Sequence, residues 1–223
     1  MKVFERRDIL LNETQIEKLE KAKIAIFGLG GVGGYAFEAL LRMGIKDFIL
    51  CDGDNFTLSN LNRQILSTSA NLNKNKAEEA KIRALSIFND LNIKVIPYNV
   101  NKENINSLGL NGYYIVDCID SVDDKIALIK YAKENGNEII SMMGAGNRLH
   151  ASFISSDIYK TSSDALSKKM RKRLREESID NLKVVYTKDD ALVHPKGNVA
   201  SISYVVGSAG LKVAEEVIKS IIE

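Results

Sequence analysis

The sequence IAIFGLGGVGG, residues 24–34, decides the fold of this chain. Its first four residues are apolar and have the length of a buried strand, and a helical pattern continues to about Met43. Between the two lie glycines in the spacing G-x-G-x-x-G, namely Gly28, Gly30 and Gly33. Glycine permits the backbone angles of a tight turn and lets phosphate approach the free N–H groups of the following helix. The stretch therefore predicts a nucleotide-binding βαβ unit.

An acidic residue follows the second predicted strand, where such units bind a ribose. The run Asp47 to Cys51 has strand length and leads directly into Asp52. This carboxylate comes 19 residues after Gly33, close to the spacing of about 20 residues that is typical of ribose-binding acids. A tight turn that binds nothing is the alternative, and the position of Asp52 favours the nucleotide site.

The rest of the first two thirds of the chain alternates between strand and helix patterns. A short helix at 13–22, capped by Asn12, precedes the glycine stretch, and a polar loop occupies residues 52–69. Further helices are predicted at 73–89, 102–108 and 122–135, and further strands at 93–97, 113–118 and 138–143. This alternation predicts a doubly wound, mostly parallel α/β sheet of the Rossmann type.

The alternation changes after Gly144. Strands are predicted at 152–156 and 183–187, a helix from Ser163 or Asp164 to about Glu177, and a last helix at 203–221. We expect these to add strands to one edge of the sheet, followed by a C-terminal helix. The predicted organisation is one domain, residues 1–223, with a nucleotide-binding core at 1–143 and a substrate-side extension at 144–223.

The composition excludes several classes of protein. The chain has 223 residues, 45% of them hydrophobic, which suffices for a sizeable core, and no apolar run of membrane-spanning length. Its net charge of +2 is too small for a polycation, so any affinity for nucleic acid must come from a local patch. The two cysteines, Cys51 and Cys118, form no C-x-x-C pair. We therefore expect no zinc site, and the buried free thiols of a cytoplasmic protein.

The residues after the second strand indicate phosphate chemistry. The loop and the next helix supply Asp54, Asn60, Arg63, Gln64 and Lys76. Arginine offers a forked donor to phosphate and lysine a mobile point charge. Hydride transfer does not need two cations at a phosphate, whereas nucleotidyl transfer does, because negative charge develops on the transferring group. No G-x-x-x-x-G-K-[ST] motif is present, which argues against a P-loop ATPase.

A further carboxylate, Asp120, comes shortly after the strand predicted at 113–118. Because the carboxyl ends of parallel strands share one edge of the sheet, we expect Asp120 to lie near the nucleotide. There it could bind Mg²⁺, which prefers carboxylate and phosphate oxygens.

Together these motifs resemble the ubiquitin-activating-enzyme-like adenylyltransferase superfamily, over residues from about 4 to 143. The resemblance rests on GLGGVGG (28–34), Asp52, SNLNRQ (59–64), Lys76 and DCIDSVDDK (117–125). It implies that Gly28, Gly30, Gly31, Gly33, Asp52 and Asp54 bind ATP, that Asn60, Arg63 and Lys76 hold the triphosphate with Gln64 beside them, and that Asp120 binds Mg²⁺. It also implies a homodimer in which Arg7 reaches the ATP of the partner subunit. The reaction would join a carboxylate to the α-phosphate and release pyrophosphate.

The remainder of the chain resembles one branch of that superfamily, the tRNA threonylcarbamoyladenosine dehydratases, over residues 144–176 and 197–219. In that branch ATP activates the threonine carboxylate of the modified adenosine, and a group of the same modification then closes a ring. Intramolecular capture needs no enzyme cysteine. This chain lacks the zinc-binding cysteine pairs of the sulfur-carrier activators, and its two cysteines are expected at strand ends, which makes covalent cysteine catalysis improbable.

A basic run, KKMRKRLR at 168–175, lies within the helix predicted after Asp164. Leu166, Met170 and Leu174 form an apolar seam at helical spacing. Around it lie six cations: Lys168, Lys169, Arg171, Lys172, Arg173 and Arg175. They could follow an RNA backbone by phosphate contacts, and a solvated helix face or a membrane surface are the alternatives.

The sequence thus predicts a homodimeric adenylating enzyme that uses ATP and Mg²⁺ and acts on tRNA bearing threonylcarbamoyladenosine. An activator of a small ubiquitin-like sulfur-carrier protein is the first alternative. A non-enzymatic nucleotide-binding module and an NAD-dependent oxidoreductase are the others. A sulfur-relay protein is considered as a further partner.

Overall fold

The computed structural model describes residues 3–162, 164–192 and 199–223, and within them seven strands form one sheet. The strands are β1 (Lys23–Phe27), β2 (Asp47–Cys51), β3 (Asn92–Ile96), β4 (Tyr114–Asp117), β5 (Ile139–Met142), β6 (Ile154–Asp157) and β7 (Lys183–Tyr186). Their order is β3-β2-β1-β4-β5-β7-β6, and only β6 runs antiparallel to its neighbour. The predicted mostly parallel sheet with strands added at one edge is confirmed.

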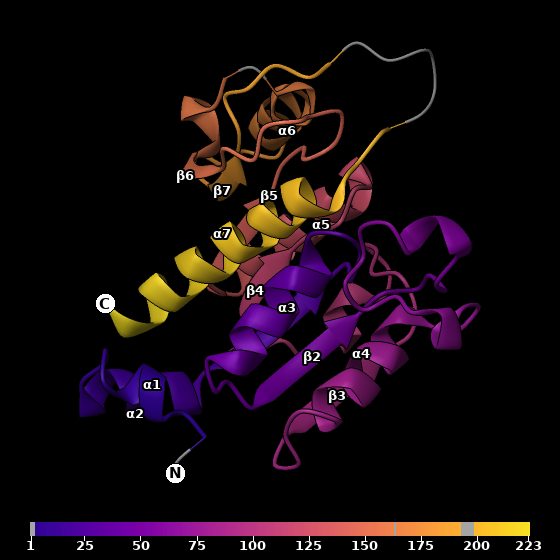
Figure 1. Cartoon of the computed structure of the whole chain (residues 1–223). Helices are drawn as coiled ribbons and strands as arrows, with labels where there is room; N and C mark the ends of the chain where they lie inside the picture. Colours follow the sequence, from indigo (N-terminus) through magenta and orange to yellow (C-terminus); the bar gives the residue numbers. More distant parts are fainter. Residues whose placement is uncertain (1–2, 163, 193–198) are drawn as a thin grey trace.

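Helices cover both faces of this sheet (Figure 1). The described helices are α1 (Glu5–Asp8), α2 (Glu13–Lys21), α3 (Gly33–Arg42), α4 (Lys76–Leu85), α5 (Val122–Glu134), α6 (Ala165–Glu176) and α7 (Ser203–Ile222), of which α3 to α7 cover the sheet. One apolar core lies under α3, α4 and α7 and contains Phe37, Ala80 and Val213. The other lies under α5 and α6 and contains Leu128 and Met170. None of the described helices combines the length and apolarity that crossing a bilayer requires.

The direction of chain winding reverses between β1 and β4. From β1 the chain adds β2 and β3 on one side, and it then returns to place β4 on the other side. At such a switch point the connections leave the carboxyl ends of the two strands in opposite directions and open a crevice between them. The topology therefore places a ligand site beyond Phe27 and Asp117, the last residues of β1 and β4.

The glycine stretch makes the tight turn that the sequence predicts. Gly28 has a φ of +86°, in the left-handed region, and its N–H donates to the carbonyl of Cys51. A Cβ on Gly33 would lie 1.8 Å from the carbonyl oxygen of Gly28. The turn can therefore close onto α3 only if position 33 carries no side chain.

The C-terminal helix α7 packs directly on α3, and the two lie side by side in Figure 1. A Cβ on Gly210 would approach the carbonyl oxygen of Val32 to 2.4 Å, so glycine allows this close contact between the helices. The same packing brings Val206 within 3.0 Å of the position that a Cβ on Gly31 would take. The last helix of the chain thus supports the glycine turn near its beginning.

Two of the predicted helices are wrong or too long. The helix predicted at 102–108 is a single 3-10 turn at Ile105–Ser107. Asn101 and Asn104 accept hydrogen bonds from nearby backbone N–H groups, which competes with helix formation. The helix predicted at 73–89 shortens to α4, because Asn75 caps it through the N–H groups of its first turn.

The start of α6 agrees with one of the two predicted caps. Asp164 is its N-cap and accepts a hydrogen bond of 2.6 Å from the N–H of Ser167, while Ser163 lies outside the described residues. Met170 and Leu174 of the predicted seam are fully buried, so the apolar side of α6 faces the core.

The contacts at the glycine turn yield a test of stability. We expect Gly33→Ala to lower the free energy of unfolding by at least about 2 kcal/mol, because the new Cβ meets backbone rather than a flexible side chain. Gly30→Ala is the matched control, since the nearest atom to its Cβ would be the Gln64 side chain at 3.8 Å. Urea unfolding of both variants measures the difference, and equal stabilities would contradict this account of the turn.

Candidate nucleotide-binding and catalytic site

A cavity of about 440 Å³ lies at the switch point, beyond the carboxyl ends of β1, β2 and β4. Its wall contains ten of the residues that the sequence analysis selected: Gly28, Gly30, Gly31, Asp52, Asp54, Asn60, Arg63, Gln64, Lys76 and Asp120. Gly33 is not part of the lining, because it packs against Gly28 and Cys118 behind the cavity wall. A cavity of this size matches an ordinary small-molecule site.

Asp52 forms the buried polar end of this cavity. Its carboxylate accepts hydrogen bonds from the N–H groups of Leu29, at 2.6 Å, and Asp54, at 2.9 Å. Burial raises the pKa of Asp52, while nearby Lys76 and these two N–H groups oppose the rise. Asp52 therefore ties the end of β2 to the glycine turn, in the position expected of a ribose-binding acid.

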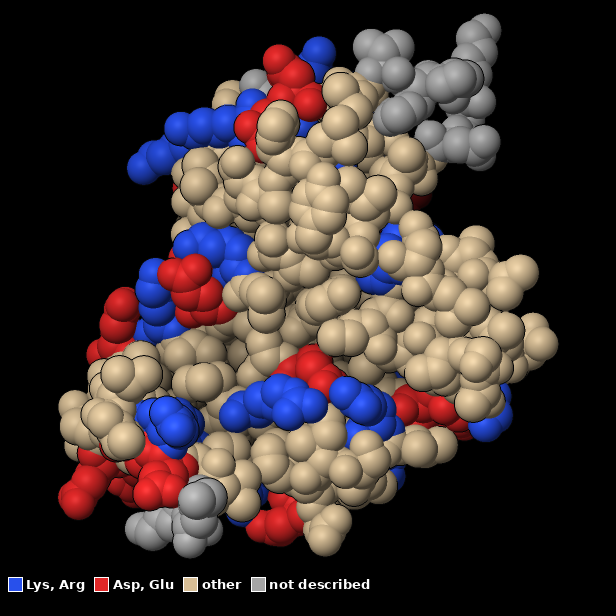
Figure 2. Space-filling model, viewed as in Figure 1, with Lys and Arg blue, Asp and Glu red and all other residues tan. Residues whose placement is uncertain are grey.

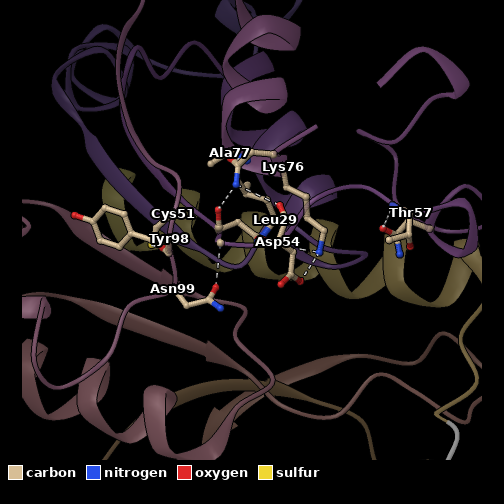
Figure 3. Close-up of polar contacts among 12 residues, drawn as sticks. Leu29, Cys51, Asp54, Thr57, Lys76, Ala77, Tyr98 and Asn99 are labelled. Atoms are coloured by element: carbon tan, nitrogen blue, oxygen red, sulfur yellow. Dashed lines mark hydrogen bonds and ion pairs between the residues drawn. The ribbon is translucent and has the colours of Figure 1, made fainter. Parts of the chain in front are cut away.

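Lys76 is the buried cation of the site, with 6% of its surface exposed. Its ammonium lies 2.7 Å from a carboxylate oxygen of Asp54 and 4.0 Å from Asp52, and Figure 3 shows it pointing toward Asp54. The side chain of Asp54 is 65% exposed. Lys76 thus lies between one buried acid, Asp52, and one exposed acid, Asp54.

Three further side chains come from the loop that follows β2. Asn60 accepts a hydrogen bond of 2.9 Å from the N–H of Thr57 and so fixes the loop. Arg63 donates to the carbonyl of Ser59 at 2.6 Å. Gln64 is buried, and its Oε1 atom has no hydrogen-bond partner among the described residues. An unpaired buried acceptor in a cavity wall suits a ligand that donates a hydrogen bond.

Asp120 lies in the exposed turn between β4 and α5. Ser121 and Asp124 line the same cavity. Asp124 lies in the first turn of α5. Within the described residues no three His, Cys, Asp or Glu side chains come together as a metal cluster. Asp120 fits Mg²⁺ nonetheless, because this cation is commonly bound by one or two carboxylates together with substrate phosphates and water.

Arg7 does not reach the cavity of its own chain. Its guanidinium donates to the carbonyl of Met43 at 2.8 Å, just beyond the carboxyl end of α3, and lies over the ring of Phe4. The glycine turn precedes the opposite end of α3 (Figure 1). Gly28, Gly30 and Gly31 of this turn line the cavity. The role of Arg7 at a partner subunit stays a prediction.

Several lining residues were missed in the sequence. Gly146 follows β5, while Val199, Ser201 and Val206 precede or begin α7. Nothing local in the sequence marks them, because sheet order brings Gly146 to the cavity and the packing of α7 on α3 brings the other three. Asn99 could have been selected from the sequence, because it is a polar residue shortly after the end of a predicted parallel strand. In the structure its Oδ1 atom accepts a hydrogen bond from the N–H of Gly53 (Figure 3).

Both cysteines line the cavity. Burial raises the pKa of Cys51 and of Cys118 to about 12. Because the thiolate is the nucleophilic form, both sulfurs are poor nucleophiles near neutral pH.

The six cations of α6 differ in their surroundings. Arg173 forms an ion pair of 2.7 Å with Asp123 of α5, Arg175 lies over the ring of Tyr159, and Arg171 donates to Thr161. Lys172 lies 4.0 Å from Glu176. Lys168 and Lys169 are exposed and form no ion pair with any described residue. These two lysines are the cations most available to an external anion.

Comparison with known proteins adds close relatives. The chain is 34% identical over 170 residues to tRNA threonylcarbamoyladenosine dehydratase of Haemophilus influenzae, which covers 75% of this chain and 65% of that protein. It is 35% identical over 170 residues to the Escherichia coli protein of the same name, with coverage of 75% and 63%. The alignment thus spans less than two thirds of either relative.

The three-dimensional fold extends this similarity over nearly the whole chain. The crystal structure of the E. coli tRNA N6-threonylcarbamoyladenosine dehydratase in complex with ATP superposes with a TM-score of 0.92 at 29% identity, and the match covers 98% of this chain and 93% of that one. The model of the ThiF family matches residues 5–223. Because this match covers nearly the whole chain, this chain belongs to the ThiF family.

Proposed function

We propose that this protein uses ATP to adenylate the threonine carboxylate of threonylcarbamoyladenosine in tRNA, in the cytoplasm, and that the activated group then closes into the cyclic form. The observation that carries the proposal is the single cavity in which Arg63, Lys76 and Asp120 accompany the glycine turn. Two cations beside a phosphate-binding turn suit nucleotidyl transfer better than hydride transfer. The similarity to tRNA threonylcarbamoyladenosine dehydratases supports the choice of substrate.

In the proposed complex the ribose of ATP binds Asp52 and the phosphates lie beside Gly30 and Gly31, at the start of α3. Arg63 and Lys76 contact the triphosphate together with Asn60. Lys76 is paired with Asp54 in the described structure. Because Asp54 is mostly exposed, it can turn toward solvent when phosphate oxygens take its place. Gln64 offers its unpaired Oε1 to a donor on the nucleotide.

Mg²⁺ is the proposed metal ion, and Asp120 is the residue that would hold it, with Asp124 lining the same side of the cavity. When bound, the cation would neutralise charge on the phosphates.

The first proposed step forms a bond between a carboxylate oxygen and the α-phosphorus of ATP. The bond from that phosphorus to the bridging oxygen breaks, and pyrophosphate leaves with the electron pair. In the second step a nucleophile within the same modification attacks the carbonyl carbon, and AMP leaves. The raised pKa of Cys51 and Cys118 supports a route without an enzyme thioester.

We propose that the segment after residue 143 is the substrate-side extension and that α6 contacts the tRNA backbone. The exposed Lys168 and Lys169 are the main candidates, and Arg171, Lys172, Arg173 and Arg175 have partners that they would have to share. Contacts of this kind position the RNA without reading its sequence.

A homodimer is also part of the proposal, with Arg7 of each subunit near the ATP of the other. Figure 2 shows an uncharged area around the first half of α7, while charged side chains gather along its second half. Tyr204 and Leu211 of α7 are about half exposed, and Ile9 and Leu10 after α1 are mostly exposed. Exposed apolar surface of this kind is typical of interaction sites. A sulfur-relay protein stays a further predicted partner.

An activator of a small ubiquitin-like carrier protein is the second candidate, since such a protein would use the same adenylating cavity. The substrate distinguishes the two functions, because a carrier presents a peptide carboxylate and no phosphate backbone. Pyrophosphate release with modified tRNA, unmodified tRNA and candidate carrier proteins decides between them. Release with modified tRNA alone is the expected result, and release with a carrier alone would overturn the proposal.

Arg63→Ala and Lys76→Met test the phosphate-binding cations. Each variant removes a charge that stabilises the transferring phosphate, and we expect pyrophosphate release to fall by about 10²–10³. Lys74→Met is the matched control, because Lys74 is an exposed cation two residues away that does not line the cavity. If the first two variants fold and keep activity within about threefold of the parent, the assigned site is wrong.

The cysteine pair tests the route without a thioester. We expect the double variant Cys51→Ser, Cys118→Ser to lose some stability, since Cys51 is buried and Cys118 packs against the core, and to keep turnover within about threefold. The measurement is pyrophosphate and AMP formation, with intact-protein mass spectrometry of the parent during turnover. An acyl adduct on either parent cysteine would contradict the intramolecular route.

Lys168→Gln together with Lys169→Gln tests the RNA contact. Since each phosphate contact releases counterions, the slope of log affinity for tRNA against log salt should fall by about one to two units, while ATP affinity stays unchanged. Lys18→Gln with Lys21→Gln on α2 removes the same charge at a distant helix and should leave the slope as it is. An unchanged slope in the α6 variant would contradict the RNA contact and favour a solvated helix face.

A further inference from the structure

A buried ion pair lies directly behind the turn that carries Asp120. Asp117 is the last residue of β4 and Lys125 lies in α5, and both side chains have 0% exposure. The ammonium nitrogen is 2.7 Å from the Oδ2 atom of Asp117. It makes no well-directed hydrogen bond to any described residue, so Coulomb attraction is the main component of this contact.

The pair joins the two ends of one short turn. Residues 118–121 connect β4 to α5, and Asp120 lies within them. The Oδ1 atom of Asp117 accepts a hydrogen bond of 3.1 Å from the N–H of Ile119, inside the turn. The backbone N–H of Lys125 donates to the carbonyl of Ser121, at the end of the turn. The ion pair therefore fixes both the start and the finish of the segment that presents Asp120.

Two neighbours extend this arrangement to the nucleotide side. Ser141 of β5 donates its hydroxyl to the Oδ2 atom of Asp117, so the carboxylate is held from α5, from β5 and from its own turn. The carbonyl oxygen of Cys118 lies 2.7 Å from the position that a Cβ on Gly28 would take. The turn that the ion pair holds is thus in direct contact with the glycine turn.

Stability alone does not account for these charges. Transferring a carboxylate and an ammonium into a dry interior costs several kcal/mol per ion, and replacing such pairs by uncharged residues of similar size often leaves stability unchanged or higher. Every other side chain that α5 buries is apolar or aromatic: Ile126, Leu128, Ile129, Tyr131 and Ala132. A charged pair at this one place, behind a functional turn, points to a requirement for fixed geometry.

We propose that the Asp117–Lys125 ion pair is a positioning element for the adenylation reaction. It holds residues 118–121 against the glycine turn so that Asp120 meets the phosphates of the nucleotide without reorganisation of the turn. This inference rests on the proposed function. Neither residue lines the cavity, and both act through the backbone of the turn.

The test is the double variant Asp117→Asn, Lys125→Met, which removes both charges and keeps the side-chain volumes and the acceptor for Ile119. We expect it to fold with a melting temperature near that of the parent. Amide hydrogen exchange in residues 118–121 should become at least about tenfold faster, while exchange in the core strands stays unchanged. The gain in ATP affinity on adding Mg²⁺ should shrink, and pyrophosphate release should fall at least about tenfold.

Lys183→Met with Glu216→Gln is the matched control, because it removes an ion pair between β7 and α7 that lies outside the cavity. It should change neither exchange at 118–121 nor turnover. Ser141→Ala is the second test variant if the double variant does not fold, and it should raise exchange at 118–121 by at least about threefold.

Parental exchange at 118–121 and parental Mg²⁺-dependent ATP binding in a folded variant would overturn the proposal. If the parent enzyme itself releases no pyrophosphate with modified tRNA, the proposed function fails. Exchange and ATP binding then still decide whether the ion pair positions the turn.

Discussion

The tight turn between β1 and α3 is the constraint on which the rest of the structure depends. The carbonyl of Gly28 occupies the space where a side chain at Gly33 would begin. The turn therefore closes directly onto the first residues of α3 and points their free N–H groups beyond the strand ends. Two distant segments then pack on it: the backbone of Cys118 after β4 and the side chain of Val206 in α7. The approach of Cys118 requires glycine at position 28, and Val206 leaves little room for a Cβ at position 31.

The buried charged side chains around this turn have defined partners within the protein. Asp52 is buried and bonded to the turn through Leu29, and Lys76 is held within the same cavity by its ion pair with Asp54. In the described structure the acids near Lys76 occupy the place that phosphate oxygens would take in the proposed complex. Binding of an anionic ligand then exchanges one ion pair for another, so the lysine never has to be desolvated without a partner.

The reactivity of the two cysteines and the accessibility of the α6 cations differ from what their residue types alone indicate. Cys51 and Cys118 line the cavity, yet burial keeps both thiols protonated near neutral pH. Of the six cations on α6, Arg173 is already paired with Asp123, which joins this helix to α5 beside the cavity. A basic run in sequence is thus divided by the fold into residues that fasten α6 and residues that are exposed to solvent.

The sequence by itself determined the features that depend on neighbouring residues: the glycine turn, the order of strands and helices, and the acid at Asp52. The helix predicted from the sequence at 102–108 was wrong, because asparagine side chains there compete with helix formation. Tertiary structure alone decided the packing of α7 on α3, the cavity wall at Val199 and Ser201, and the ion pair of Asp117 with Lys125. These contacts join segments whose distance in space is set by sheet order and helix packing, which no local pattern of residues records.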